Sequence, residues 1–542
     1  MFKRKVVLLL FVSAMLMPIL TSCSATKPSD KEISKTNEIP LKIINAVIVE
    51  DPSTADVQKT SEYYGVPLNI YDRLVECVTI DKEPQLIPGL AEAWNVSQDG
   101  LVYTFNLVKG VRFHNGEELK ADDVLYTINR MMNPDTAAVN VDFFNMIKGA
   151  DAMFEGNADT VEGVKIIDDY TVEITLEVPF APFLANLATP GCSIYNRKAT
   201  EAAGDKFGID PALTIGTGPF IFSKWGMNEE IVLLKNPDYF KGAPKLDGVR
   251  FKIIPDPETQ RMMFETGEID VFDTSYARSQ LAYFKTHPKY KDKIISGPEA
   301  GLYFYSFNAE VEPFNNVKVR KALQMAIDRQ SIIDAMYDGE GKLVEAFIPE
   351  GTLGFNPNSP KIEYNPEKAK QLLAEAGYPN GFEMEVVQTA DSSATLAMNE
   401  VVQSMFEQIG VKVNIKQVDS ATYYGLRAEG KLPTYRSVWW ADYNDPDNFL
   451  YTFFSERNAK IRSSNYSNPV VFAGLEKART MIDQEERMKL YQELEQILVH
   501  EDAIIIPLFQ MNHLFILNDN VQNFQLSWNG WSDMSYYNIT LE

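Results

Sequence analysis

The second half of the chain alternates between segments with strand-like and helix-like spacing of apolar residues. Residues 382–389 predict a strand, residues 394–410 an amphipathic helix, and residues 411–418 a second strand. A strand, a helix and a strand in this order favour a βαβ crossover, in which a helix connects two parallel strands. This part of the chain is therefore predicted to have an α/β fold.

Other helices in this half are marked by their capping residues. Residues 315–337 predict one long amphipathic helix with Asn315 or Asn316 as its N-cap. Residues 365–379 predict a shorter helix, with Pro366 in its first turn and Gly377 past its end. A helix over residues 484–502 leads into the wholly apolar strand 503–509.

The first half also mixes strands and helices. An aspartate pair, Asp122-Asp123, is predicted to begin a helix that runs through Met132. The other predicted elements are a β-hairpin element over 102–116 ending in Asn115-Gly116, a strand pair over 164–178 with Asp168-Asp169 in its turn, strands over 231–237 and 246–254, and a helix over 258–270 ending near Gly267. With 542 residues the chain is too long for one ordinary core, and the repeated alternation predicts two α/β lobes.

The N-terminus has the organisation of an export signal. Three basic residues, Lys3 to Lys5, precede the apolar stretch 6–20, which is shorter than a bilayer-spanning helix. The stretch ends in Leu20-Thr21-Ser22-Cys23, which resembles a bacterial lipobox. That resemblance implies a lipoprotein signal peptide over 1–22, lipidation of Cys23, and a flexible tether over 23–40.

The charge of the chain argues against nucleic acid as a partner. The formal net charge is −24, and 51 basic residues less the three in the signal leave 48 against 75 acidic residues, a net charge of −27. A protein that binds phosphate backbones needs a basic stripe, and none is evident in the sequence.

No motif of an enzyme, a cofactor site or a metal site is evident. The four histidines, His114, His287, His500 and His513, lack metal-ligand spacing, and each is predicted to be a surface or capping residue. Paired acids for glycoside hydrolysis stay open because the chain has 75 acidic residues. Cys77 and Cys192 could form a disulfide or remain two buried thiols.

Eight segments in order resemble the extracytoplasmic solute-binding proteins of ABC importers, in the family that carries oligopeptides, dipeptides and nickel. These segments are residues 88–130, 216–225, 233–251, 266–270, 314–333, 364–382, 439–450 and 503–509. Together they extend over nearly all of residues 41–542, and a lipobox is typical of a Gram-positive member.

The resemblance implies an α/β, two-lobed periplasmic-binding-protein-like fold of type II that closes on its ligand in an interlobe cleft. The core of the first lobe would comprise residues 41–72, 196–301 and 513–542, with an additional subdomain over 73–195. The second lobe would comprise residues 302–512. Members of the family are not enzymes, need no cofactor, deliver ligand to permease subunits in the membrane, and are expected to be monomers.

The stretch WWADYNDPDNFL, residues 439–450, combines two tryptophans with three aspartates. By resemblance to oligopeptide-binding members, Asp442 would bind the α-ammonium group of a peptide, and Trp439 would line a side-chain pocket. Arg436 and Arg427 correspond to arginines that can bind the ligand's carboxylate. Val438 and Trp440 are candidates to present main-chain groups to the peptide.

Structural roles compete with ligand contact at several of these positions. Asp445-Pro446-Asp447 is predicted to form a turn with helix-capping acids. Trp440 can belong to the core or the cleft, and Arg436 can pair with a neighbouring acid. Tyr126 can face the cleft from the first lobe or simply pack on its helix.

The leading hypothesis is a lipid-anchored receptor on the outer face of the cell membrane that captures di- or oligopeptides for an importer. Capture of nickel, a nickel chelate or another solute by the same fold is an alternative, against which the few histidines argue. Presentation of a peptide pheromone would use the same binding chemistry. An extracellular hydrolase is a remote alternative, because no nucleophile or metal motif supports it.

Overall fold

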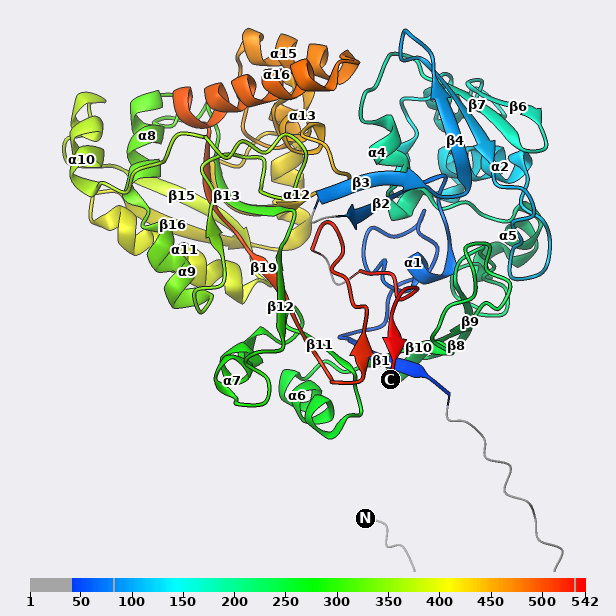
Figure 1. The fold of residues 1–542 in the computed structure, drawn as a ribbon. Helices are drawn as coiled ribbons and strands as arrows, with labels where there is room; N and C mark the ends of the chain where they lie inside the picture. Colours follow the sequence, from blue (N-terminus) through cyan, green and yellow to red (C-terminus); the bar gives the residue numbers. More distant parts are fainter. Residues whose placement is uncertain (1–40, 81–82, 531–532) are drawn as a thin grey trace, which may run out of the picture. The chain divides into compact units, whose positions relative to one another are not determined.

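The computed structural model describes residues 41–80, 83–530 and 533–542 (Figure 1). The predicted signal peptide, the tether and Cys23 lie outside the described residues. Residues Lys42–Glu542 form one compact unit, which contains several separate β-sheets with helices between them.

One four-stranded sheet combines a strand from the start of the described chain with three strands from residues 220–253. Strand β1 (Ile43–Ile48) pairs in parallel with β10 (Gly248–Ile253), which continues antiparallel into β9 (Glu230–Lys235) and β8 (Phe220–Gly226). The predicted strands 231–237 and 246–254 are confirmed. Helix α6 (Pro257–Thr266) follows and ends at Gly267, where φ is +80°, as predicted from a glycine past the helix end.

A second sheet is formed by residues between 91 and 175. Its strand order is β4 (Ala91–Val96), β5 (Val102–Leu107), β7 (Thr171–Thr175) and β6 (Val164–Asp168), which confirms the strand pair with its turn at Asp168-Asp169. The predicted β-hairpin element over 102–116 is confirmed only for residues 102–107, where β5 forms a hairpin with the preceding strand β4. Strand β5 ends at Leu107 and pairs with β4 and β7, while the Asn115-Gly116 turn closes a single bridge between Arg112 and Glu118.

Helix α2 (Ala121–Met132) begins one residue earlier than the aspartate pair suggested. Lys120 is the N-cap residue, and the carboxylate of Asp123 accepts a hydrogen bond from its N–H (3.0 Å). Asp122 and Asp123 thus lie in the first turn, where negative charge is favourable near the helix N-terminus.

The C-terminal half contains the predicted βαβ unit. Strands β15 (Glu383–Thr389) and β16 (Lys412–Val418) are parallel, and α11 (Ser393–Glu407) connects them. Beside them lies a sheet with the order β14 (Lys342–Leu343), β18 (Ile505–Gln510), β13 (Gly301–Phe307) and β17 (Thr434–Trp440). All six residues of β18 are buried, as expected for a wholly apolar strand.

The single helix predicted over 315–337 is wrong, because the structure contains two helices there. Helix α8 (Val317–Ala326) is capped by Asn316 and ends at Ile327, whose backbone is extended. The side chain of Asp328 then accepts the Ser331 N–H (3.1 Å) and starts α9 (Arg329–Met336). An aspartate cap competes with helix continuation, and spacing alone does not show which of the two is favoured.

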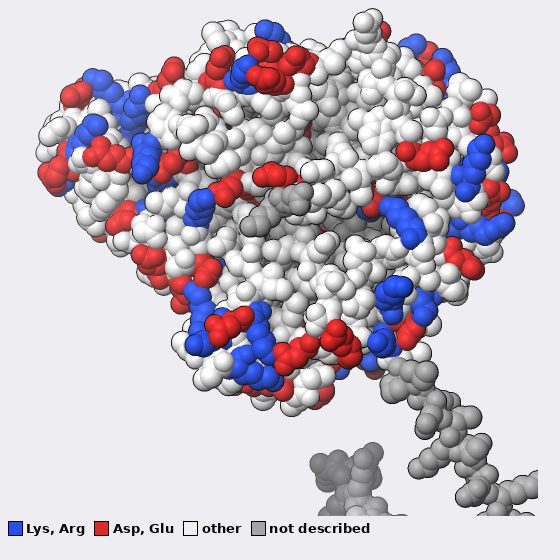
Figure 2. Space-filling model, in the orientation of Figure 1, with Lys and Arg blue, Asp and Glu red and all other residues white. Residues whose placement is uncertain are grey.

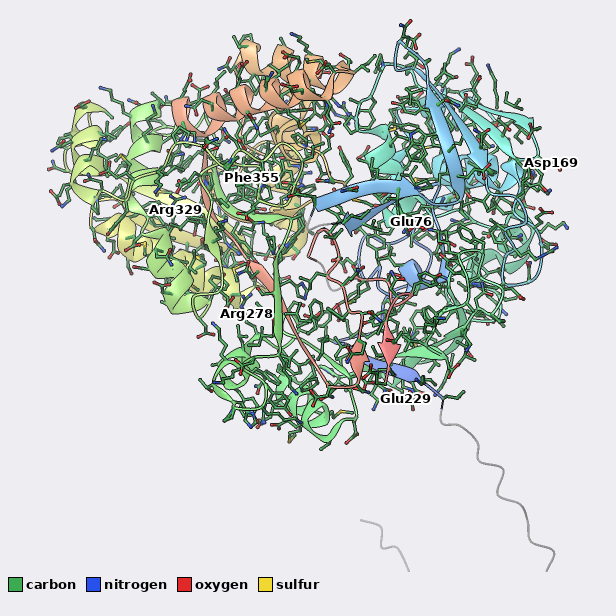
Figure 3. All side chains as sticks on the ribbon, in the orientation of Figure 1. Glu76, Asp169, Glu229, Arg278, Arg329 and Phe355 are labelled. Atoms are coloured by element: carbon green, nitrogen blue, oxygen red, sulfur yellow. The ribbon has the colours of Figure 1, made fainter. Side chains whose placement is uncertain are left out.

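The break also places a buried arginine. Arg329, labelled in Figure 3, is 5% exposed, and its guanidinium group donates to the carbonyl oxygens of Val344 (2.5 Å) and Ile362 (2.9 Å) and to the Glu345 carboxylate (3.0 Å). These contacts tie the start of α9 to the segment that follows it.

Two other helices match their predictions. Helix α10 (Pro366–Glu375) is capped by Asn365, with φ of +94° at Gly377. Helix α16 (Gln484–Gln496) continues into one π-helical turn over Ile497–Glu501 before β18.

The chain passes twice between the sheet that contains β13 and β18 and a three-stranded sheet that lies next to it in the chain. Strand β12 (Ile294–Pro298) leads into β13, and β18 leads into β19 (Asn512–Leu517), which pairs with β12 and with β11 (Val271–Asp273). The two passages run side by side in Figure 1. The Glu299 N–H donates to the Met511 carbonyl (3.0 Å), and the Gln510 amide donates to the Glu299 carbonyl (2.6 Å). Hydrogen bonds therefore connect the two passages directly.

His513 on β19 is buried, so its predicted surface or capping role is wrong. It is 3% exposed, stacks on Phe515 with ring centres 4.4 Å apart, and its Nε2 lies 2.8 Å from Oδ1 of Asp273. Burial alone would lower the pKa of His513, but the Asp273 carboxylate outweighs it and raises that pKa above its ordinary value.

Glu495 on α16 is a buried carboxyl group in the C-terminal half, and its protonation state can be tested. It is 2% exposed, and its Oε1 accepts the N–H groups of Phe347 and Ile348, both at 2.7 Å. Burial raises the pKa of Glu495 to about 8. The stability contributed by its protonated form is full below the unfolded pKa near 4 and is lost as the pH rises through 8.

We therefore expect Glu495→Gln to unfold at the same temperature as the unmodified protein at pH 4.5 and at a higher temperature at pH 8. The difference in the free energy of unfolding between the variant and the unmodified protein should grow by at most about 1.4 kcal/mol per pH unit between pH 4.5 and pH 8. Thermal unfolding across this pH range measures it, and a difference that does not change with pH would contradict the neutral, buried state of Glu495.

Candidate ligand-binding cavity

A cavity of about 330 Å³ lies among the described residues. Its wall comes from residues 61–87, 140–143, 185–190, 219–241 and 523–539, together with one residue from the 439–450 stretch, Asp442. The charged side chains that line it are Asp72, Arg73, Glu76, Lys241, Asp442 and Asp533. Asp442 is thus brought to one site with residues more than 200 positions away in the sequence.

Asn448 fixes the position of Asp442. The Asp442 N–H donates to Oδ1 of Asn448, and Nδ2 of Asn448 donates to Oδ2 of Asp442, both at 3.0 Å. Nε1 of Trp439 donates to the same Oδ1, also at 3.0 Å. One asparagine thus orients both of the strongest ligand-binding candidates, and nothing in the sequence reasoning identified it.

The charge of the Asp442 carboxylate is only partly compensated. Burial raises its pKa above the ordinary value of an aspartate, and the Asn448 amide and the Arg462 charge act in the opposite direction. The Arg462 guanidinium packs over Trp439, 4.9 Å from the ring centre, and over Phe453 at 4.8 Å. Within the described part of the chain Asp442 forms no ion pair, so a cation from a ligand would improve its environment.

The other two aspartates of the stretch have structural roles, as predicted. Asp445 is 3% exposed and pairs with Arg487 through two hydrogen bonds of 2.7 and 2.5 Å, and it also accepts the Asp447 N–H (2.9 Å). Asp447 begins α13 (Asp447–Phe454) and lies 3.1 Å from Nε of Arg479. These buried pairs hold the turn that carries Asp442 and Asn448.

Strand β17, which leads to Asp442, has a free edge at its C-terminal end. The Asn308 N–H donates to the Pro433 carbonyl (3.0 Å) and the Ala441 N–H to the Ala300 carbonyl (2.8 Å). Because hydrogen-bonded residues alternate along an antiparallel pair, Val438 and Trp440 direct their main-chain groups away from β13. Among the described strands β17 pairs only with β13, so these groups are available to an extended ligand.

Asp442 is the one predicted site residue in the lining of this cavity, and the others lie outside it: Trp439, Val438, Trp440, Arg436, Arg427 and Tyr126. Arg436 donates to Oγ1 of Thr395 (2.9 Å) and packs over Tyr303 (5.0 Å), and Arg427 on α12 (Ser420–Ala428) packs over Tyr424 (4.9 Å). Trp440 donates to the Glu299 carboxylate (3.0 Å) and lines a neighbouring hollow of about 460 Å³. Tyr126 lines a different hollow, of about 450 Å³, with Arg130 and Arg197.

The two cysteines in the described residues are unpaired. Cys77 lies on β2 (Val75–Ile80) and lines the cavity, while Cys192 is buried, and both are free thiols. Nearby Glu76, labelled in Figure 3, accepts a hydrogen bond from Lys241 (2.7 Å). The reading of two unpaired thiols is therefore the one that the structure supports.

The described residues contain neither a metal-binding cluster nor a membrane-spanning helix. Within residues 41–80, 83–530 and 533–542, no group of three or more histidine, cysteine or acidic side chains is placed to hold a metal ion. None of the helices in the described residues is long and apolar enough to cross a membrane. On the face shown in Figure 2, basic side chains are interspersed with acidic ones.

Comparison with known proteins identifies the family. Residues 85–460 match the model of the bacterial extracellular solute-binding proteins, family 5. The chain belongs to this family. It is 32% identical to heme-binding protein A of Haemophilus influenzae over 556 aligned positions, which cover 97% of each chain, and 33% identical to the dipeptide-binding protein of Escherichia coli, which covers 82% of this chain and 84% of that one.

Solved structures agree with the family 5 fold. HbpA2 of Haemophilus parasuis superposes with a TM-score of 0.80 at 31% identity, over 92% of this chain and 99% of that one. DppA of Helicobacter pylori, in complex with the peptide STSA, gives 0.73 at 30% identity, over 92% and 98%. The expected two-lobed α/β binding-protein fold is confirmed, and the chain is an extracytoplasmic solute-binding protein of an ABC importer.

The two kinds of aspartate in the 439–450 stretch should respond differently to substitution. Arg487→Met leaves the Asp445 carboxylate buried without its partner and should destabilise the protein by about 3–5 kcal/mol. Asp442→Asn removes a desolvated charge and keeps an acceptor for Asn448, so the ligand-free variant should be at least as stable as the unmodified protein. Urea unfolding measures both, and a large loss of stability in Asp442→Asn would assign Asp442 a structural role instead.

Proposed function

We propose that this family 5 protein captures short peptides by their α-ammonium group and delivers them to the importer. The observation that supports this most strongly is the position of Asp442. Its partly compensated carboxylate lines the cavity and directly follows the strand whose main-chain groups face an open edge. A peptide can use both features at once.

An ammonium group suits the chemistry of Asp442. It offers three donors and a positive charge, and charge-assisted hydrogen bonds in a desolvated site are stronger than neutral ones. The Asn448 amide occupies one side of the carboxylate and leaves acceptor capacity for the ligand. Trp439, with Arg462 packed over it, would exclude water from one side of the pair.

The peptide backbone would continue along β17. Val438 and Trp440 present N–H and C=O groups on the open edge, and addition of an extended strand uses such groups without regard to side-chain identity. Arg436 and Arg427 are proposed to contact the carboxylate of longer peptides. Tyr126 is proposed to contact the ligand from the first lobe only if the two lobes rearrange. Nearer the Asp442 end, the cavity volume of about 330 Å³ is at the lower limit of ligand pockets, which favours short peptides.

The relatives carry different names, which include heme-, dipeptide-, glutathione- and oligopeptide-binding proteins. Three of these four ligands are peptides in the chemical sense. An acidic side chain in the cavity and an open strand edge are features that recognise an amine and an extended backbone, so they favour the peptide ligands over heme.

Binding is proposed to proceed by closure of two lobes, with boundaries as predicted from the sequence at about residues 302 and 512. The linked strand passages beside Glu299 and Met511 would serve as the hinge. A ligand that contacts Asp442 and the opposite wall of the cavity binds the closed form better than the open one, and this difference in affinity drives closure. We further propose a monomer held at the outer face of the membrane by lipidated Cys23.

The proposal predicts a strict requirement for a free amino terminus. Titration calorimetry should detect binding of dipeptides and tripeptides, and N-acetylation should weaken it at least about 30-fold, since truncating one partner of a buried charge pair costs about 2–5 kcal/mol. Asp442→Asn should lose affinity for free peptides by a similar factor while its affinity for the acetylated forms stays unchanged.

Asp151→Asn is the matched control, because Asp151 is an exposed aspartate on α3 (Ala150–Phe154), away from the cavity lining. It should bind as the unmodified protein does. If free and acetylated peptides bind equally well, Asp442 does not hold the ammonium group. If mass spectrometry of ligand retained during purification finds no peptide and no titrated peptide binds, the peptide proposal is wrong.

A further inference from the structure

Arg73 is a buried cation of the cavity lining that forms no ion pair within the part of the chain that the structure describes. It is 9% exposed and lies two residues before β2, on the wall formed by the first part of the chain. Its Nε and Nη1 atoms are buried without a hydrogen bond, and within the described residues its guanidinium group forms no ion pair. The three other arginines of comparable burial, Arg320, Arg329 and Arg487, donate to carbonyl or carboxylate oxygens.

The acidic neighbours of Arg73 are occupied by other groups. The carboxylate of Asp72 accepts hydrogen bonds from Thr217 (2.7 Å) and Tyr239 (2.8 Å). Glu76 is paired with Lys241 (2.7 Å). The other cation of the cavity lining is thus neutralised by a partner, and Arg73 is not.

Two thiols near Arg73 are neutral. Burial raises the pKa of Cys77 and of Cys192 to about 12, although the charge of Arg73 acts to lower both. The thiols therefore stay protonated at physiological pH and do not compensate the guanidinium charge. Leaving an ion buried without a counter-ion costs several kcal/mol, so such a group is expected where an incoming ligand supplies the opposite charge.

We propose that Arg73 anchors a carboxylate group of the ligand. The fork of guanidinium N–H groups matches a carboxylate better than any other common ligand group. Asp442 and Arg73 line the same cavity and neither forms an ion pair within the described residues, so a zwitterion would bring an opposite charge to each of them. The ligand class narrows to short peptides whose carboxylate is buried together with their ammonium group.

This inference deepens the proposed function and rests on it for the identity of the ligand. The carboxylate can be the C-terminus or an acidic side chain, because the recognition chemistry is the same. It also assigns carboxylate binding to the first part of the chain, whereas Arg436 and Arg427 are engaged with Thr395, Tyr303 and Tyr424.

The test compares three probes by titration calorimetry: trialanine, trialanine amide, and the amide of alanyl-glutamyl-alanine. The unmodified protein should bind a carboxylate-bearing probe at least about 30-fold more tightly than trialanine amide. In Arg73→Met this preference should vanish, and in Arg73→Lys it should be reduced. Preference for trialanine indicates the C-terminus as the anion, and preference for the glutamyl probe indicates a side chain.

Two controls separate recognition from structure. Arg457→Met removes an exposed arginine on α14 (Glu456–Ile461), away from the cavity lining, and should keep the preference for carboxylate. Ligand-free Arg73→Met should unfold at the same temperature as the unmodified protein or at a higher one, because it loses an uncompensated buried charge. A clearly lower unfolding temperature would show that Arg73 has a structural partner and would overturn the proposal.

Acetate provides a probe that does not depend on peptides. At constant ionic strength, acetate should raise the unfolding temperature of the unmodified protein and not that of Arg73→Met. If acetate behaves so while no peptide binds, the anion site stands and the peptide function fails. If peptides bind with the same preference for carboxylate in Arg73→Met as in the unmodified protein, the assignment of Arg73 is wrong and the peptide function stands.

Discussion

The site depends on a carboxylate that is held in place without being neutralised. Asn448 fixes Asp442 through two hydrogen bonds, and the start of α13 that carries Asn448 is in turn fixed by the buried pairs of Asp445 with Arg487 and Asp447 with Arg479. Two of the three aspartates, Asp445 and Asp447, have arginine partners inside the protein. Asp442 has none within the described residues and is proposed to take its cation from the ligand.

The proposed closure involves contacts that the protein already makes. The strand passages proposed as the hinge are joined to each other at Glu299, Gln510 and Met511, and residues 180–181 contact α15 (Pro469–Thr480) directly. There the Ala181 N–H donates to the Arg479 carbonyl (2.8 Å), and the Arg479 guanidinium packs over Phe180 (4.7 Å). In the proposed mechanism, ligand would add to these contacts and would shift the equilibrium between the open and closed forms by the difference between its affinities for them.

Elements that depend on local signals were predictable from the sequence. The βαβ unit around α11, the turn at Asp168-Asp169 and the helix ends at Gly267 and Gly377 follow from spacing and from the conformational needs of individual residues. The predictions were wrong where a helix cap competed with helix continuation and where the partners of a strand lay elsewhere in the chain. The cap at Asp328 broke a helix whose apolar spacing was continuous, and β5 found its partners in β4 and β7 instead of in the residues after its own turn.

The residues of the candidate site likewise divide into those that the sequence could identify and those that it could not. Asp442 and Trp439 could be singled out because a resemblance marked their positions, but neither Asn448 nor Arg73 could be. The role of Asn448 depends on the geometry of one turn, and Arg73 is distinguished only by the partners that it lacks. Whether an arginine is compensated depends on residues such as Thr217, Tyr239 and Lys241, which occupy the nearby acids from far along the chain.

The most direct test of the central claim is a crystal structure of the protein with a bound tripeptide. The account predicts that the α-ammonium nitrogen lies within hydrogen-bonding distance of the Asp442 carboxylate, about 2.7–3.2 Å, with the peptide backbone paired to Val438 and Trp440. A peptide bound in the cavity with its amino terminus away from Asp442 would contradict it.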